Sequence, residues 1–306
     1  MSLFHKNFTS ITELSCSQIE ELLNRAAVFE TGQDNLFNQI LEGQILALIF
    51  FTASTRTQLS FQTAVLRLGG QPIFFSDSNP VPGRRRPVEA LRDLARVIDS
   101  YADAVVLRHP YAESVREFTE FSRIPIISGG TGVCVGAEHP TQTLVDLYTL
   151  RKAHDRIGHL RVLIMGELDG RASRSLIAAL SLFPGNVIYL LYPDENPPVK
   201  ADLEIAQMRG VKITRVYCIR SVISDVDAIY HNGIDSRSSY DQIYYRLNTK
   251  IIESLPERSV VMHPLPRHKN ELSFDVDGHP SARYFEQSAA GVPVRMAVLE
   301  AILQCK

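Results

Sequence analysis

The chain has 306 residues, a length that predicts about two domains of roughly 150 residues, each long enough to bury its own core. Its 32 Lys and Arg against 34 Asp and Glu give a net charge of -2, and 45% of the residues are hydrophobic. These proportions exclude a disordered chain and a protein that holds nucleic acid through a generally basic surface. An anion bound by this chain must therefore meet a local cluster of cations or helix N-termini.

The cysteines lie far apart along the chain, at Cys16, Cys134, Cys218 and Cys305. Because no CxxC or Cys/His spacing occurs, we expect no metal site, and we interpret the cysteines as reduced thiols of a cytoplasmic protein. The N-terminus lacks a signal-peptide pattern and no run of about 18 apolar residues occurs, so we expect no membrane partner.

Short apolar runs rich in Ile, Val and Phe alternate with segments of helical period, which predicts parallel strands covered by crossover helices. In chain order, strands are predicted at 45–51, 72–75, 103–107, 124–128, 161–166, 187–191, 211–217, 227–231 and 259–264. We therefore expect an α/β fold with two doubly wound parallel sheets.

Amphipathic helices are predicted from apolar side chains spaced three and four residues apart, at 19–26, 88–98 and 294–302. The segment 139–154 has Pro140 suited to a first helical turn, and an apolar stripe of Leu144, Leu147 and Tyr148. We predict that this helix links a first domain, residues 1–138, to a second domain, residues 155–285.

The first candidate site is the turn between the strand at 45–51 and a helix that continues from Leu59. It contains Ser54, Thr55, Arg56 and Thr57. Hydroxyl donors, a guanidinium and the free N–H groups of a helix N-terminus suit a phosphate at the carboxyl edge of a parallel sheet. The alternative is an ordinary N-cap beside a solvated arginine, which local physical chemistry alone favours.

Three further segments place polar groups at strand ends or at a helix start, where open α/β sheets bind ligands. They are Arg108-His109-Pro110, His139-Pro140-Thr141-Gln142 and His263-Pro264-Leu265-Pro266-Arg267. The prolines of the last segment donate no N–H, which leaves strand-end carbonyls to accept hydrogen bonds from an NH2 group. A loop with Arg84, Arg85 and Arg86 either faces solvent or closes over an anion. Taken singly, each segment is better explained by a structural role than by a catalytic one.

Together and in this order, these segments resemble the aspartate/ornithine carbamoyltransferase family. The resemblance extends from about His5 to the C-terminal helix and includes Phe75-Ser76-Asp77-Ser78 and Gly291-Val292-Pro293-Val294-Arg295. The HPLPR form at 263–267 is similar to that of the aspartate branch. The resemblance implies a carbamoyl-phosphate domain, an amino-acid domain, and a C-terminal helix at 286–306 that packs on the first domain. It also implies a homotrimer with active sites shared between subunits, and it leaves the presence of a regulatory chain open.

The resemblance further implies a role for each matching residue. The residues that would bind the phosphate are Ser54, Thr55, Arg56, Thr57 and Arg108. Those that would polarise the carbamoyl oxygen are Thr57, Arg108 and His139. The groups that would accept from the carbamoyl NH2 are Gln142 and the carbonyls of Leu265 and Pro266. Arg171 would bind the amino acid, and a neighbouring subunit would supply one of Arg84, Arg85 and Arg86. Fixed donors lower the barrier to acyl transfer, so no cofactor is expected.

The amino-acid side departs from the family pattern. Where the family has an Arg and, two residues later, a Gln that hold aspartate, this sequence has Gly233 and Asp235. A carboxylate at that place repels a dicarboxylate acceptor. The family's Glu in the turn before the phosphate-binding residues is Thr52 here, and its partner Arg aligns with Ser238, beside Arg237.

Several explanations fit this departure. Arg174, Arg237 or Arg246 replaces the missing clamp, or the loops are shifted relative to the family's. Alternatively the acceptor is another amine, or the protein binds carbamoyl phosphate without turnover. The leading prediction is an enzyme that transfers the carbamoyl group of carbamoyl phosphate to L-aspartate in pyrimidine synthesis.

Overall fold

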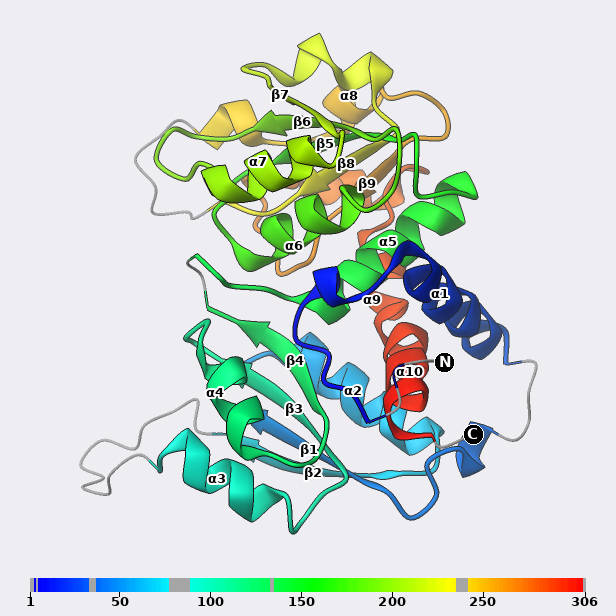
Figure 1. The fold of residues 1–306 in the computed structure, drawn as a ribbon. Coiled ribbons are helices and arrows are strands. Elements are labelled where there is room, and N and C mark those ends of the chain that lie inside the picture. Colours follow the sequence, from blue (N-terminus) through cyan, green and yellow to red (C-terminus); the bar gives the residue numbers. More distant parts are fainter. Residues whose placement is uncertain are drawn as a thin grey trace. The chain divides into compact units, whose positions relative to one another are not determined.

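A computed structural model describes residues 3, 5–32, 37–76, 89–132, 135–234 and 242–304 of the chain (Figure 1). The chain divides into two compact units: unit 1 is Met1–Leu144 with Gly291–Lys306, and unit 2 is Val145–Ala290. All nine predicted strands are present, and the predicted α/β class with two parallel sheets is confirmed. None of the described helices is long and apolar enough to cross a membrane.

Unit 1 is built on four parallel strands in the order β2-β1-β3-β4. They are β1 (Ile45–Phe50), β2 (Gln71–Ser76), β3 (Ala104–His109) and β4 (Ile126–Thr131). The side chains of β3 and β4 are buried along their whole length, as expected for strands covered on both faces. This burial explains why β3 begins with the continuous apolar run at 104–107 and why β4 contains no charged side chain.

Five helices belong to unit 1: α1 (Cys16–Thr31), α2 (Thr55–Arg67), α3 (Leu91–Ile98), α4 (Ser114–Phe121) and α10 (Gly291–Leu303). Leu94 and Ile98 of α3 and Phe118 of α4 pack against Ala47 and Ile49 of β1 in one buried cluster. The helix predicted at 88–98 begins later, since Glu89 and Ala90 are not helical. Val88 lies outside the described residues.

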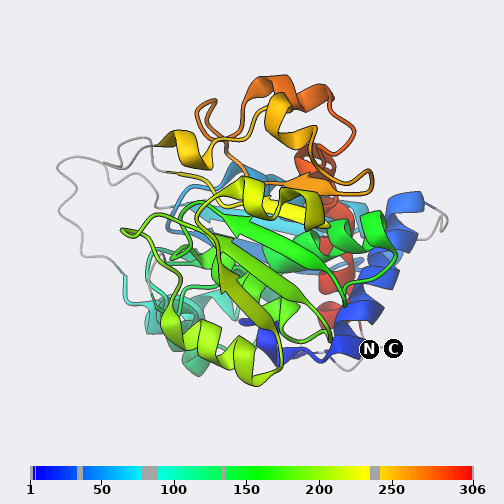
Figure 2. The ribbon, with the colours of Figure 1, turned by 90° about the horizontal axis from the view of Figure 1, so that it is seen from above.

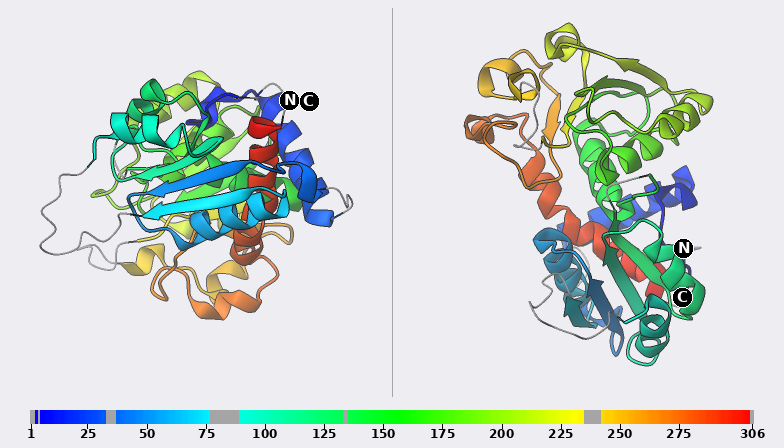
Figure 3. Two further views of the ribbon diagram at one scale, coloured as in Figure 1. Left: turned by 90° about the horizontal axis from the view of Figure 1, so that it is seen from below. Right: turned by 90° about the vertical axis from the view of Figure 1, so that its left-hand side faces the viewer.

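The C-terminal helix α10 packs against α1 and α2, as the red helix in Figure 3 shows. Every residue from Pro293 to Leu303 is buried, so α10 is surrounded by protein rather than lying on a surface. The predicted return of the last helix to the first part of the chain is confirmed.

Unit 2 is built on five parallel strands in the order β7-β6-β5-β8-β9. They are β5 (Arg161–Met165), β6 (Val187–Leu191), β7 (Lys212–Arg215), β8 (Ala228–His231) and β9 (Val260–Met262). The helices are α6 (Arg171–Leu180), α7 (Lys200–Met208), α8 (Thr249–Ile252) and α9 (Tyr284–Ala289), and α5 (Pro140–His154) carries the chain from unit 1 into unit 2.

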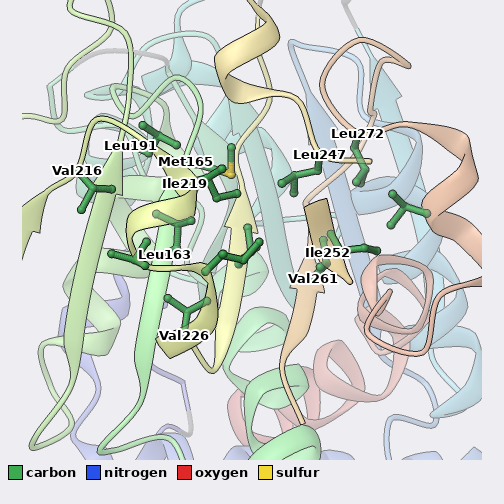
Figure 4. Packing of buried hydrophobic residues seen from close by; sticks show 14 of the residues in the cluster. Leu163, Met165, Leu191, Val216, Ile219, Val226, Leu247, Ile252, Val261 and Leu272 are labelled. Atoms are coloured by element: carbon green, nitrogen blue, oxygen red, sulfur yellow. The ribbon is translucent and has the colours of Figure 1, made fainter. Parts of the chain in front are cut away.

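One face of this sheet is covered by short segments rather than by long helices. Leu163 and Ile229 of the sheet pack against Ile219 and Ile223, which come from two short 3-10 turns, Ile219–Ser221 and Ile223–Asp225 (yellow in Figure 2). Leu247, Ile252 and Leu272 complete the cluster (Figure 4). The connection from β7 to β8 has only residues 216–227, about the shortest that a parallel crossover allows, so it holds no full helix.

Each sheet has one place where the chain leaves two neighbouring strands in opposite directions. In unit 1 this place lies between β1 and β3, because β2 is on the far side of β1 and β4 on the far side of β3. In unit 2 it lies between β5 and β8. Open α/β sheets bind ligands at such switch points, outside the carboxyl ends of the strands. The fold therefore singles out the turns after β1, β3, β5 and β8.

Candidate active site

The turn after β1 leads directly into α2. Ser54 is the N-cap residue of α2, but its side chain makes no capping hydrogen bond within the described structure, so the ordinary N-cap explanation is not supported. The first turn of α2 contains no acidic residue that would occupy the free N–H groups. Arg56 is exposed in this turn, although partial desolvation lowers its pKa. This one turn therefore carries free N–H groups, hydroxyls and a guanidinium, the groups that bind an anion.

Arg108, the next-to-last residue of β3, lies beside this turn. The N–H of Phe51 donates to the Arg108 carbonyl over 2.9 Å, which joins the ends of β1 and β3. The Arg108 side chain is only 6% exposed, and its Nη1 donates to the Gly129 carbonyl over 2.9 Å. A buried guanidinium held from β4 is a fixed cation at the switch point of unit 1.

His139 is brought to the same place by the loop between β4 and α5. The N–H of Thr131 donates to the Glu138 carbonyl over 2.9 Å, which fixes the residue before His139 at the end of β4. The Nε2 atom of His139 lies 3.4 Å from Oγ1 of Thr57, and both residues are less than 10% exposed. Gln142 is half-buried in the first turn of α5.

Gly130 leaves room for the side chains of Arg108 and His139 to lie close together. The sequence pattern did not predict this role of Gly130. Its φ is +104°, and a Cβ there would lie 2.8 Å from Nη1 of Arg108 and 3.0 Å from Cδ2 of His139. Any larger residue would push these two side chains apart. The Gly129-Gly130 pair at the end of an apolar run was the available signal.

His109, the other titratable residue of the β3 segment, has a structural role. Its Nδ1 accepts from the N–H of Tyr111 over 3.2 Å and lies 2.5 Å from Oγ of Ser114. Burial lowers the pKa of this imidazole. His109 therefore shapes the turn into α4 as a hydrogen-bond acceptor.

In unit 2, Arg171 is the first residue of α6 and follows the turn after β5. Its side chain is half-buried, and desolvation lowers its pKa. The turn is tied to the end of β8, since the N–H of Glu167 donates to the Gly233 carbonyl over 3.0 Å and Nδ2 of Asn232 donates to the Glu167 carbonyl over 2.5 Å. Arg171 thus occupies the switch point of unit 2.

Gly233, which stands at the family's clamp position, has a φ of +93° that disfavours any larger side chain. Its N–H donates to Nδ1 of His231 over 3.0 Å, and the N–H of Ile234 donates to Oε2 of Glu271 over 2.7 Å. The turn at 233–234, here named the acceptor turn, therefore directs its backbone donors into the protein. Asp235, Arg237 and Ser238 lie outside the described residues.

The segment after β9, here named the carbamoyl turn (His263–Arg267), is shaped by its own histidine. Nδ1 of His263 accepts from the N–H of Leu265 over 2.8 Å, Leu265 has a φ of +53°, and the bond to Pro266 is cis. Arg267 donates to Tyr284 Oη over 3.1 Å and to Asp277 Oδ2 over 2.7 Å. Arg267 thus anchors the turn to the protein.

Of the arginines considered as substitutes for the clamp, Arg174 is unsuitable. Its Nε lies 2.6 Å from Oδ2 of Asp202, and only 8% of its side chain is exposed. The pair joins α6 to α7, so the guanidinium already has a carboxylate partner. Arg246 is exposed. Arg84, Arg85 and Arg86 lie outside the described residues, as does Arg237.

Two further features of the described residues are separate from these turns. No group of three or more His, Cys, Asp or Glu in the described ranges is placed to hold a metal ion. A pocket of about 450 Å³ in unit 2 is lined by Lys152 of α5, Arg258 just before β9, and Arg283 and Glu286. It lies at the amino end of β9, whereas the candidate residues lie at the carboxyl ends of their strands.

A helix N-terminus with hydroxyls and arginines at the switch point of unit 1 and a half-buried arginine at that of unit 2 are features of a two-unit α/β enzyme that acts on an anionic substrate. Residues 6–152 match the family model of the aspartate/ornithine carbamoyltransferase carbamoyl-phosphate-binding domain, and residues 159–302 match that of the Asp/Orn-binding domain. The chain belongs to the aspartate/ornithine carbamoyltransferase family, as the resemblance predicted.

Similar curated proteins carry the name of the aspartate branch. The chain is 39% identical to the aspartate carbamoyltransferase catalytic subunit of Methanocella arvoryzae, and the match covers 99% of both chains. It is 37% identical to the catalytic subunit of Alkaliphilus oremlandii, and that match covers 99% of this chain and 92% of the relative. Aspartate transcarbamoylase of Trypanosoma cruzi, solved with carbamoyl aspartate and phosphate, superposes with a TM-score of 0.89 at 30% identity over 99% of this chain and 97% of that one. The Methanocaldococcus jannaschii catalytic subunit superposes with a TM-score of 0.86 at 36% identity over 96% and 97%.

Proposed function

We infer that this chain is an enzyme that transfers the carbamoyl group of carbamoyl phosphate to the amino group of L-aspartate, giving N-carbamoyl-L-aspartate and phosphate for pyrimidine biosynthesis. The observation that carries this function is the convergence of Thr57, Arg108 and His139 beside the N-terminus of α2. Aspartate as acceptor is supported by relatives of that name and by neighbouring structures that contain aspartate or carbamoyl aspartate.

We propose that the turn after β1 holds the phosphate group. Ser54, Thr55 and Thr57 provide hydroxyl donors, and Arg56 and Arg108 provide guanidinium groups. The free N–H groups at the start of α2 add the positive end of the helix dipole. Each charge-assisted hydrogen bond also stabilises the additional charge that the phosphate takes on as it leaves.

The carbamoyl oxygen would accept hydrogen bonds from Thr57, Arg108 and His139. The lone pair of a neutral amine attacks the carbamoyl carbon and forms the new C–N bond. The C–O bond to phosphate then breaks, the phosphate leaves with the electron pair, and the departing phosphate takes up the proton that the amine nitrogen loses. Because Thr57 and Arg108 are buried and fixed before the reaction, they need little reorganisation in the transition state.

For the remaining substrate atoms we propose that Gln142 and the carbonyls of Leu265 and Pro266 accept from the carbamoyl NH2. Arg171 would hold one carboxylate of aspartate. The second carboxylate requires a cation outside the acceptor turn, because Gly233 has no side chain and the N–H groups of Gly233 and Ile234 are bound internally. Arg237 or Arg246 would supply it, and a neighbouring subunit would contribute Arg85 or Arg86 to the site.

A homotrimer is our proposal for the assembled enzyme. β2 is an edge strand, and it exposes Ile73, Phe74 and Phe75 by 38%, 43% and 44%. An unpaired strand edge with contiguous exposed apolar side chains is typical of a surface that another subunit covers. The cytoplasmic location stays a prediction from the cysteine pattern.

The deciding experiment is an assay of the purified protein with carbamoyl phosphate and L-aspartate that measures carbamoyl-aspartate formation. A panel of other amino acids is run in parallel. We expect turnover with aspartate. If product formed only with another amine, Gly233 and Asp235 would mark a change in acceptor specificity. If carbamoyl phosphate bound but no product formed with any amine, a non-catalytic role would be favoured.

A further inference from the structure

One buried carboxylate, that of Glu271, joins two turns of unit 2: the carbamoyl turn, and the acceptor turn, which is hydrogen-bonded to the loop that leads to Arg171. Glu271 is 2% exposed and follows the carbamoyl turn by four residues. Its two oxygens accept hydrogen bonds from different segments. A buried charge is costly unless it is fully hydrogen-bonded, so this arrangement indicates a specific use.

The first oxygen of Glu271 holds the acceptor turn. Oε2 accepts from the N–H of Ile234 over 2.7 Å, and a Cβ on Gly233 would lie 3.7 Å from the same oxygen. Through the Glu167–Gly233 hydrogen bond, the acceptor turn also contacts the loop that leads to Arg171. The position of this oxygen therefore sets the position of the acceptor turn.

The second oxygen holds the carbamoyl turn. Oε1 accepts from the N–H of His268 over 2.7 Å and lies 3.2 Å from Nε2 of His263. Because Nδ1 of His263 accepts from the N–H of Leu265, the proton of this imidazole must be on Nε2, which donates to Glu271. Glu271 thus fixes the ring that in turn fixes the backbone of Leu265.

The surroundings keep Glu271 ionised. Burial by itself raises the pKa of this carboxyl, but the hydrogen bond from His263, the nearby rings of His231 and His263 and the hydrogen bond from the His268 N–H outweigh burial, so the pKa lies below its ordinary value. An ionised carboxylate is an acceptor only, which suits three N–H donors, one from the acceptor turn, one from the carbamoyl turn and one from His268 directly after it. The ring of His231 stacks on that of His263 with centroids 5.6 Å apart and closes the cluster.

We infer that Glu271 is a positioning residue that holds the carbamoyl turn directly and, through the acceptor turn, the loop that leads to Arg171, so that the carbamoyl NH2 and aspartate are bound in mutually correct positions. The inference rests on the proposed function for the tasks of Arg171 and of the carbamoyl turn. Its consequence is that one side chain which touches no substrate controls both aspartate binding and the chemical step.

The test is Glu271→Gln, which keeps the shape but turns one acceptor oxygen into an NH2 group that opposes an N–H donor. The matched control is Asp227→Asn, because Oδ2 of Asp227 also accepts a backbone N–H, that of Arg161, over 2.7 Å at the opposite edge of the same sheet. Steady-state kinetics give kcat and both KM values. Calorimetry gives the Kd of inorganic phosphate and of N-(phosphonacetyl)-L-aspartate, and unfolding gives Tm.

We expect Glu271→Gln to raise the KM for aspartate, to lower kcat, and to reduce kcat/KM by about 10- to 100-fold, the effect of a small misplacement of binding groups. The phosphonacetyl-aspartate should bind correspondingly more weakly, while the Kd of phosphate stays within about twofold. Asp227→Asn should change only Tm. The inference would be overturned if the kinetic and binding constants of Glu271→Gln stayed within about twofold of the parent's. It would also be overturned if activity fell in proportion to Tm to the same extent in Glu271→Gln and Asp227→Asn. The proposed function is tested separately, by aspartate turnover of the unaltered protein. The Kd measurements test the role of Glu271 even if the protein shows no turnover.

Discussion

Oγ1 of Thr57 lies 3.4 Å from Nε2 of His139, although 82 residues separate them in the chain. Thr57 is in the first turn of α2 and His139 immediately precedes α5. Their approach places two hydrogen-bond donors from different elements next to Arg108, which Gly130 admits to the same place. The pair is therefore the point at which the carbamoyl oxygen is expected to bind.

Removing the hydroxyl of Thr57 should slow the chemical step. Thr57→Val has nearly the same volume, so we expect a kcat about 100-fold lower from the loss of one fixed donor to the developing oxyanion. Steady-state kinetics at saturating substrates check this. Thr149→Val is the control, because the Thr149 hydroxyl is also buried but donates only to the Val145 carbonyl within α5. An equal loss of kcat in both variants would contradict the assignment.

The phosphate site is tested by Arg56→Ala. Because Arg56 is exposed in the first turn of α2, its replacement should leave the Tm of the free protein nearly unchanged. It should remove most of the Tm increase that phosphate or carbamoyl phosphate produces, since a charge-assisted hydrogen bond contributes about 1.5–3 kcal/mol. Arg67→Ala, at the other end of the same helix, should retain the full increase. Undiminished stabilisation of Arg56→Ala by phosphate would remove the turn from the site.

The sequence pattern predicted the sheets well because burial on both faces makes parallel strands continuously apolar. β1 of unit 1 and β9 of unit 2 are such runs, and the hydroxyls and cations that follow β1 and β3 identified the switch point of unit 1. Arg171, at the switch point of unit 2, was assigned only by the resemblance to the family. The polar partners within unit 2 were not predictable in the same way. The pairing of Arg174 with Asp202 and the use of Glu271 by two turns depend on distances between segments, which local periodicity does not carry.

Arg171 and Arg174 lie one turn apart on α6 but should respond differently to replacement. Arg171→Ala should raise the KM for aspartate by about 10- to 100-fold, from loss of a hydrogen bond between charges, with little change in the KM for carbamoyl phosphate. Arg174→Ala should instead lower Tm, because it leaves the partly buried Asp202 carboxylate without its partner. Kinetics and thermal unfolding of both variants separate the two roles, and equal effects of Arg171→Ala on both KM values would contradict its assignment.

The exposed edge of unit 1 predicts the effect of a charge on assembly. Ile73→Lys places a cation on β2, where burial against another subunit would cost several kcal/mol, so we expect the trimer to dissociate. Sedimentation velocity measures this change. Met208→Lys is the control, since Met208 is an apolar residue of α7 with 80% exposure. A parent protein that sediments as a monomer would refute the trimer.

Stability should fall on mild acidification because of His231. Burial, with the adjacent His263, lowers the pKa of His231 to about 4. The unfolded chain therefore binds a proton at this position below pH 6.5, whereas the folded chain does not until about pH 4, so the contribution is fully present above pH 6.5 and is lost as the pH falls toward 4. The expected loss is about 3 kcal/mol over this range. Urea unfolding between pH 8 and pH 5 should show a shallower decrease for His231→Asn than for the parent, even though the variant is less stable at pH 8. Parallel decreases in the two proteins would assign the acid sensitivity to other groups.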